Sequence, residues 1–177
     1  NTSIYKIITR NSLSLKEEKE LKKYIEKKKL IYIATPFSYK AAKWLNDNNL
    51  KVFKIGSGEC NNIPFIKYIC SFNKPMIIST GMNNLETVKK TVRIVKKNKI
   101  PHAILHCINL YPTDYKYIRL GRLNKMNKIF KSSILLFLNA TGNYCCPSCC
   151  EILLLGQSCS IFTELANFLI FFTAFHD

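Results

Sequence analysis

Residues 75–97, PMIISTGMNNLETVKKTVRIVKK, contain one complete unit of the repeat that decides the fold. The apolar run at residues 75–79 is short and uninterrupted, as in a strand of a parallel sheet that is covered on both faces. After a short segment that contains glycine, residues 85–97 place three valines on one side of a helix with 3.6 residues per turn. This stretch therefore predicts a strand, a loop and a helix.

The same unit recurs along the chain, with apolar runs that begin near residues 30, 52, 75, 103 and 134. A helical pattern lies between each pair of runs. Ser14 and Glu17 form a capping box that predicts a helix from there to about residue 29, and residues 119–130 give the last helix. Strands that alternate with helices in this way predict a parallel sheet of the α/β class. The alternation alone leaves a closed barrel and an open doubly wound sheet as alternatives.

The composition is strongly basic. Lys plus Arg total 27 and Asp plus Glu total 11, so the formal net charge is +16. Such a charge makes nucleic-acid binding a candidate function. The lysines are spread over the predicted helices rather than gathered in one arm, however, and no nucleic-acid-binding motif accompanies them. We therefore expect no nucleic-acid partner.

The eight cysteines raise the question of the redox compartment. Residues 1–10 contain no apolar secretory signal, so we expect a cytoplasmic protein with reduced thiols. Cys146 and Cys149 have the spacing of a zinc or redox pair, but no second pair accompanies them, which favours ordinary thiols. The apolar tail at residues 164–177 is shorter than the about 20 residues of a transmembrane helix. We expect an exposed or buried end segment there, and no membrane contact.

Polar residues gather where the predicted strands end. Because the carboxyl ends of parallel strands lie on one edge of a sheet, we expect these side chains to converge. A lysine charge, hydroxyl donors and glycine-flanked backbone N–H groups suit a ligand that bears phosphate, and a carboxylate suits acid–base chemistry. The residues are Thr35, Lys54, Ser57, Glu59, Ser79, Asn109 and Tyr111.

Some of these residues also have a purely structural interpretation. Thr35 before Pro36 suits a turn, and residues 79–81 suit a cap for the next helix. Lys54 is harder to explain structurally, because a lysine inside an apolar strand needs a partner or a wet cavity. The set as a whole favours a binding site.

Seven short motifs are specific in their combination, order and spacing: TPFS at 35–38, KIGSGE at 54–59, NIPF at 62–65, KP at 74–75, ISTGM at 78–82, LHC at 105–107 and YPT at 111–113. With these motifs the chain resembles the sialic acid synthase family, which includes the pseudaminic and legionaminic acid synthases. The resemblance covers about residues 13–130.

The resemblance implies an α/β fold, namely a partial (β/α)8 TIM barrel that lacks the family's first βα units and its C-terminal antifreeze-like domain. The phosphoenolpyruvate-binding barrel domain would span residues 1–163, diverging after about residue 131, and residues 164–177 would form an apolar tail. From about residue 132 the sequence becomes rich in Cys, Leu and Phe, which favours a fragment, a reading-frame error or a decayed gene. The resemblance also implies a homodimer for the intact family.

The resemblance further implies a transferase. The family condenses phosphoenolpyruvate with N-acetylmannosamine or a related amino sugar, giving a nonulosonic acid and phosphate, and the sequence does not identify the acceptor sugar. Glu59 takes the position that is implicated in catalysis. The positions that hold the substrates match Thr35, Lys54, Ser57, Ser79, Asn109 and Tyr111.

The chain departs from the family at the metal site. In the family a divalent metal, usually Mn²⁺, orients and polarises the sugar aldehyde, and two histidines hold it. The matching positions carry Ala140 and Ile161, neither of which can coordinate a cation. We therefore expect no metal site, and an incomplete or inactive copy of the synthase. The alternative is a non-catalytic, degenerate barrel that binds a ligand or a partner chain.

Overall fold

The computed structural model describes residue 6, residues 12–108, residue 117 and residues 119–137, 152–155 and 171–175. Strands and helices alternate from α2 to β5, as the sequence predicts. The helices are α2 (Leu15–Lys27), α3 (Tyr39–Asp47), α4 (Ile63–Cys70), α5 (Leu85–Lys97) and α6 (Gly121–Phe130), with a short 3₁₀ turn, η1 (Ser57–Glu59). The strands are β1 (Tyr32–Pro36), β2 (Val52–Ile55), β3 (Met76–Ser79), β4 (His102–Cys107), β5 (Ser133–Phe137), β6 (Ile152–Leu155) and β7 (Phe171–Phe175).

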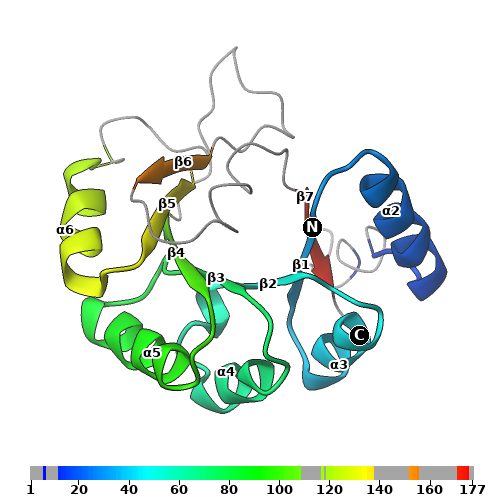
Figure 1. The fold of residues 1–177 in the computed structure, drawn as a ribbon, viewed down its shortest axis with the longest axis horizontal. Helices are drawn as coiled ribbons and strands as arrows, with labels where there is room; N and C mark the ends of the chain where they lie inside the picture. Colours follow the sequence, from blue (N-terminus) through cyan, green and yellow to red (C-terminus); the bar gives the residue numbers. More distant parts are fainter. Residues whose placement is uncertain are drawn as a thin grey trace.

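All seven described strands belong to one sheet, in the order β6-β5-β4-β3-β2-β1-β7. Each of β1 to β4 pairs in parallel with the strand that follows it, which confirms the predicted α/β class and parallel sheet. Figure 1 shows that the sheet is curved and that α2 to α6 lie along its convex side. The sheet therefore has a helix-covered face and an opposite, concave face.

Two strands were not predicted from the sequence. β7 lies in the apolar tail and pairs in parallel with β1, with Tyr32 opposite Phe171 and Pro36 opposite Phe175. β6 pairs in antiparallel fashion with β5. Consequently β1 and β5, the first and last predicted strands, each have a neighbour on both sides.

The first strand begins two residues later than predicted, because Leu30 completes the end of α2. Lys29 has a left-handed backbone with φ of 58°, and the Leu30 N–H donates to the Ile25 carbonyl oxygen at 3.2 Å. This arrangement terminates a helix by satisfying one of its last carbonyls. The start of α6 is displaced for a related reason, since φ of 50° at Arg119 is incompatible with the predicted helix start at that residue.

The main apolar core lies between the sheet and the helices. In the strands every second side chain belongs to this core, for example Phe53, Ile55 and Ile78. Because successive side chains of a strand point to opposite faces, the residues between them point to the concave face. Val52 and Ile77 fit this pattern, since both are buried but lie outside the cluster that packs against the helices.

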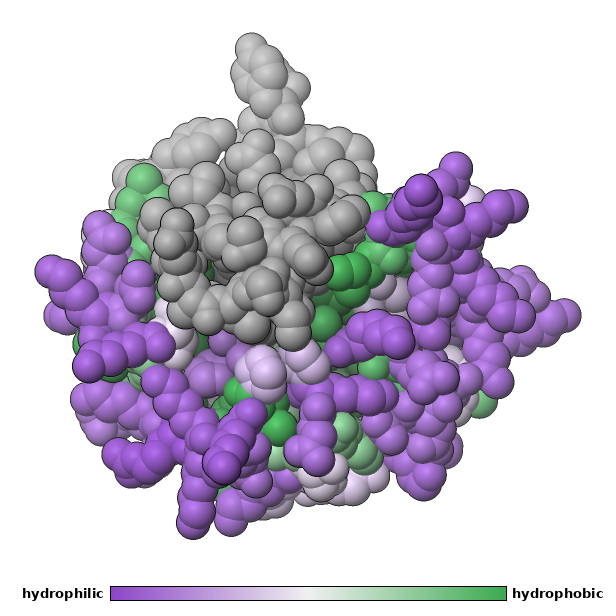
Figure 2. Space-filling model, viewed as in Figure 1, coloured by the Kyte–Doolittle hydropathy of each residue, from purple (hydrophilic) through white to green (hydrophobic). Residues whose placement is uncertain are grey.

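The outer surface of the described part is hydrophilic. Figure 2 shows hydrophilic side chains along the left, lower and right sides of the view, where the helices lie, rather than in a single patch. None of the described helices combines the length and apolar character needed to cross a membrane.

Candidate functional site

The carboxyl ends of β1, β2 and β3 bring the predicted site residues to one edge of the sheet. Thr35 lies near the end of β1, Lys54 lies within β2, and Ser79 ends β3. The register pairs Lys54 of β2 with Ile77 of β3, and Ser79 of β3 with Leu105 of β4. The carboxyl ends of these neighbouring strands therefore lie at the same edge of the sheet. By the alternation of the strands, these polar side chains share the concave face, away from the helices.

Ser57 and Glu59 lie in η1, directly after β2, and are half-buried. The structure therefore places five of the seven predicted residues on adjoining strand ends. Asn109 and Tyr111 lie outside the described residues, as do Ala140, Ile161, Cys146 and Cys149.

The Ser79 hydroxyl is the most informative polar group of the site. Its side chain is 1% exposed, and its Oγ has no hydrogen-bond partner in the part of the chain that the structure describes. Leaving a buried hydroxyl unsatisfied costs about 1–3 kcal/mol, and such groups are rare in folded proteins. A ligand oxygen at this position would remove that cost.

Lys54 contributes a positive charge next to Ser79. Burial raises the pKa of the Cys107 thiol, and the Lys54 charge, the Ser79 hydroxyl and the backbone amides of Thr80 and Gly81 limit that rise. The Lys54 ammonium therefore lies close to the start of the loop after β3 and to the end of β4. A cation and backbone N–H groups that converge in this way favour an anion.

Cys107 itself was not predicted to belong to the site. It follows Leu105 on the same face of β4, so the two-residue period of the strand was the signal that could have identified it. Cys60 and Cys70 differ from it, since burial raises the pKa of each to about 11 and neither lines the site. Those two are ordinary buried thiols.

Glu59 is held by the start of the next helix. The Asn62 side chain donates to the Glu59 carboxylate at 2.7 Å, and its oxygen accepts from the Phe65 backbone N–H at 3.3 Å as the cap of α4. A single amide therefore both caps α4 and orients the carboxylate. The NIPF motif supplies this arrangement in sequence.

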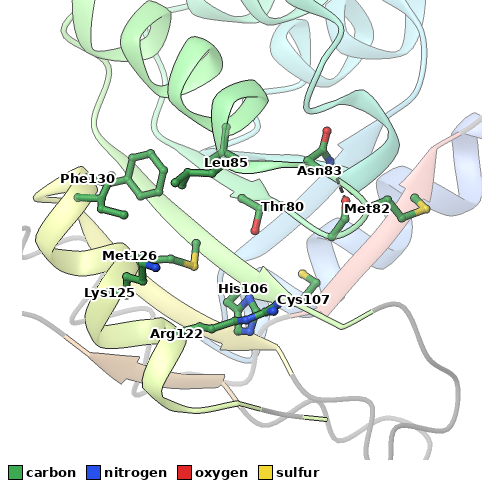
Figure 3. Close-up of a pocket in the computed structure, with 13 residues that line it drawn as sticks. Thr80, Met82, Asn83, Leu85, His106, Cys107, Arg122, Lys125, Met126 and Phe130 are labelled. Atoms are coloured by element: carbon green, nitrogen blue, oxygen red, sulfur yellow. Dashed lines mark hydrogen bonds between the residues drawn. The ribbon is translucent and has the colours of Figure 1, made fainter.

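Asn83 is a second residue that the sequence did not single out. Its side-chain amide donates to the Ser57 carbonyl oxygen at 2.7 Å and, as Figure 3 shows, to the Gly81 carbonyl oxygen at 2.6 Å. It therefore joins η1 to the loop after β3. Its identification depends on tertiary contacts between segments 26 residues apart, which local patterns do not reveal.

Gly56 permits the close approach of two strand ends. A Cβ atom at this position would lie 3.3 Å from the Phe37 ring and 3.5 Å from the Thr35 methyl group. The first distance is tighter than ordinary contact, so the absence of a side chain lets η1 lie against the end of β1.

No group of three His, Cys, Asp or Glu side chains that could hold a metal occurs among the described residues. The described donors at the sheet edge are one ammonium, hydroxyls, one carboxylate and backbone amides. This set suits an oxyanion rather than a transition metal.

Residues 1–136 match the model of the NeuB family. The chain is 33% identical over 131 residues to the N,N'-diacetyllegionaminic acid synthase of Campylobacter jejuni, which covers 72% of this chain and 39% of that protein. It is 30% identical over 112 residues to the human N-acetylneuraminate-9-phosphate synthase, covering 63% of this chain and 31% of that protein. The chain thus spans less than half the length of these relatives.

Superposition on solved structures agrees with the sequence comparisons. The N-acetylneuraminic acid synthetase of Leptospira borgpetersenii superposes with a TM-score of 0.71 at 21% identity, covering 92% of this chain and 52% of that one. The spore coat polysaccharide biosynthesis protein spsE of Bacillus subtilis gives a TM-score of 0.70 at 26% identity, covering 78% of this chain and 39% of that one. The chain therefore shares the fold of these proteins.

Proposed function

This chain belongs to the NeuB family, and we propose that its sheet edge is the phosphoenolpyruvate site of a nonulosonic acid synthase. The reaction is the condensation of phosphoenolpyruvate with N-acetylmannosamine or a related amino sugar. In this proposal β1 to β5 are five strands of a partial (β/α)8 barrel, and the site lies at their carboxyl ends. The family also supports a cytoplasmic homodimer as the working form.

The observation that carries the proposal is the buried Ser79 hydroxyl. Among the described residues it has only the Cys107 thiol, a weak hydrogen-bonding group, as a neighbour, and it lies on the same face as the Lys54 ammonium. A structural serine would be expected to have satisfied its hydroxyl. A serine that awaits a phosphate or carboxylate oxygen accounts for the arrangement.

The roles of the residues follow from their chemistry. Lys54 supplies the charge that holds the phosphate or carboxylate, and the hydroxyls of Thr35, Ser57 and Ser79 donate to the remaining oxygens. In the reaction, C3 of phosphoenolpyruvate attacks the aldehyde carbon of the open-chain sugar, whose oxygen takes up a proton. Water then adds at C2 and phosphate leaves, which produces the ketone. Glu59, oriented by Asn62, supplies a carboxylate for proton transfer.

The metal of the family is not assigned to this chain. Ala140 and Ile161, which match the two metal-binding histidines, have no donor atoms, and the described residues contain no alternative group of three ligands. A divalent cation would polarise the sugar aldehyde if it were bound. We propose that these 177 residues bind phosphoenolpyruvate without turning it over.

The test is calorimetric titration of the 177-residue chain with phosphoenolpyruvate. We expect Lys54→Ala to weaken binding roughly 10- to 100-fold, since a charge-assisted hydrogen bond contributes about 1.5–3 kcal/mol. The matched control is Lys51→Ala, an exposed lysine three residues earlier, which should leave the affinity unchanged. Equal affinity of both variants for phosphoenolpyruvate would contradict the proposed site.

A phosphate-release assay separates the synthase from the alternative, a degenerate barrel that only binds. We expect no release of phosphate from phosphoenolpyruvate when N-acetylmannosamine is added to this chain. Release that depends on the sugar would show that the chain is an active synthase after all. Binding without release supports the non-catalytic form.

A further inference from the structure

A cavity of about 380 Å³ lies between α5 and α6, above the end of β4 (Figure 3). Its volume falls within the about 300–1,000 Å³ that is typical of small-molecule sites. Three parts of the chain line it: the loop after β3 with the first turns of α5, the end of β4, and one side of α6. None of the site residues predicted from the sequence lines this cavity.

One side of α6 supplies a wall with two distinct halves. Arg122, Lys125, Met126 and Ile129 all line the cavity, and their spacing of three, four and seven residues places them on one face of the helix. The two cations lie in the first half of α6, whereas the apolar side chains lie in its second half. The wall is therefore basic at one end and apolar at the other.

The wall opposite α6 likewise has an apolar part and a polar part. Leu85 and Val88 of α5 contribute apolar surface, and Thr80 and Asn83 contribute polar groups nearer the loop. Figure 3 shows Leu85 and Asn83 across the cavity from Met126 and Lys125. The cavity can therefore accommodate a molecule with an apolar part and a polar part.

The charge of the cavity has one sign. Arg122 and Lys125 both line it, and the thirteen described residues that line it include no Asp or Glu. A concave site lined by charge of one sign raises the local concentration of oppositely charged ligands. The cavity therefore favours an anion.

This cavity adjoins the candidate phosphoenolpyruvate site but extends to the opposite side of the sheet. His106 and Val88 line the cavity on the helix side of the sheet, whereas Lys54 and Ser79 lie on the concave side. The two sites meet only at Cys107 and the loop after β3, where Asn83 donates to the Ser57 carbonyl oxygen at 2.7 Å.

We propose that the cavity between α5 and α6 is a second ligand site, which binds a small organic phosphate or carboxylate that carries an apolar group. The acid group contacts Arg122 and Lys125. The apolar group lies against Met126 and Ile129. The proposal does not depend on the function proposed for the sheet edge.

The test is calorimetric titration of the 177-residue chain with phenyl phosphate. We expect binding that the double substitution Arg122→Ala and Lys125→Ala weakens at least about tenfold, since two charge-assisted contacts are lost, even after the screening of exposed charges is allowed for. Inorganic phosphate and phenol, each titrated alone, should bind more weakly than phenyl phosphate. Arg122 and Lys125 are exposed, so the variant should melt at the temperature of the unaltered chain.

Two controls locate the binding. Lys128→Ala removes a charge from the same helix outside the cavity and should leave the affinity for phenyl phosphate unchanged. Phenyl phosphate should still bind to the Lys54→Ala variant, and the double variant should retain the affinity for phosphoenolpyruvate. The proposal is overturned if phenyl phosphate does not bind, if the double variant binds it as well as the unaltered chain does, or if Lys54→Ala abolishes its binding.

Discussion

At the scale of single residues, substitution of Ser79 should affect ligand affinity and the free energy of unfolding in different ways. Its buried hydroxyl has only the weakly hydrogen-bonding Cys107 thiol beside it among the described residues, so it contributes little to the stability of the ligand-free fold. Replacing Ser79 with Ala removes the unsatisfied group and should leave the free energy of unfolding unchanged or raise it by about 1 kcal/mol. The same substitution should weaken phosphoenolpyruvate binding roughly tenfold.

Denaturant titration and calorimetry measure the two effects separately. Ser71→Ala is the control, because Ser71 is exposed at the end of α4, before the amino end of β3, whereas the site lies at the carboxyl end of that strand. It should leave the affinity unchanged. A large loss of stability in Ser79→Ala, with unaltered affinity, would mean that the hydroxyl is structural.

Asn83 and Cys107 were not predicted from the sequence, and both were missed for the same physical reason: the contacts that place them at the site form only in the folded chain. Thr35, Lys54 and Ser79 could be predicted, because each is a polar residue in or directly after an apolar run. Asn83 could not, because its importance lies in a contact with Ser57 across the sheet edge. Cys107 resembles any other apolar strand residue in the sequence, and its exposure to the Lys54 charge follows only from the folded structure.

At the scale of elements, three helices end in the same way. A residue with φ between 55° and 58° follows the helix, and the next residue, an apolar one, donates its N–H to the carbonyl five residues earlier. The pairs are Leu30 with Ile25, Leu50 with Leu45, and Ile100 with Val95. Glycine is the residue best suited to the left-handed position, yet this chain has Lys29, Asn49 and Lys99 there.

Lys99→Gly should therefore stabilise the protein by about 0.5–1 kcal/mol, since it relieves the unfavourable left-handed backbone after α5. The control is Lys90→Gly, on the exposed face within α5, which should destabilise by about 1 kcal/mol because glycine is a poor helix former. Thermal denaturation of both variants measures the difference. A lower melting temperature for Lys99→Gly would contradict the assignment of strain to this position.

The elements were predicted with unequal success, for reasons that the structure makes plain. The strands β1 to β5 and their helices were located to within two residues. The strands are continuous apolar runs, whereas apolar residues recur every three to four positions in the helices, so the two patterns are easily told apart. β6 and β7 were missed, because their short apolar segments lie outside the alternation of strands and helices that marks β1 to β5. That β7 lies beside β1 depends on a pairing across more than 130 residues of sequence, which no local pattern encodes.

At the scale of the whole molecule, two features oppose each other. The net charge of +16 repels copies of the chain from one another. The described sheet ends at β6 and β7, each of which has a neighbouring strand on one side only among the described strands. A strand at the edge of a sheet offers backbone groups to a second copy and promotes association.

The balance between these features should depend on salt. At about 0.01 M salt the Debye length is about 30 Å and repulsion keeps copies apart, whereas at about 0.15 M it falls to about 8 Å and the edges can meet. We therefore expect light scattering to report a larger mean mass at the higher salt concentration, increasing with protein concentration. A protein that remains a monodisperse monomer with a sharp thermal transition at both salt concentrations would contradict this, and would mean that the edges of β6 and β7 are protected.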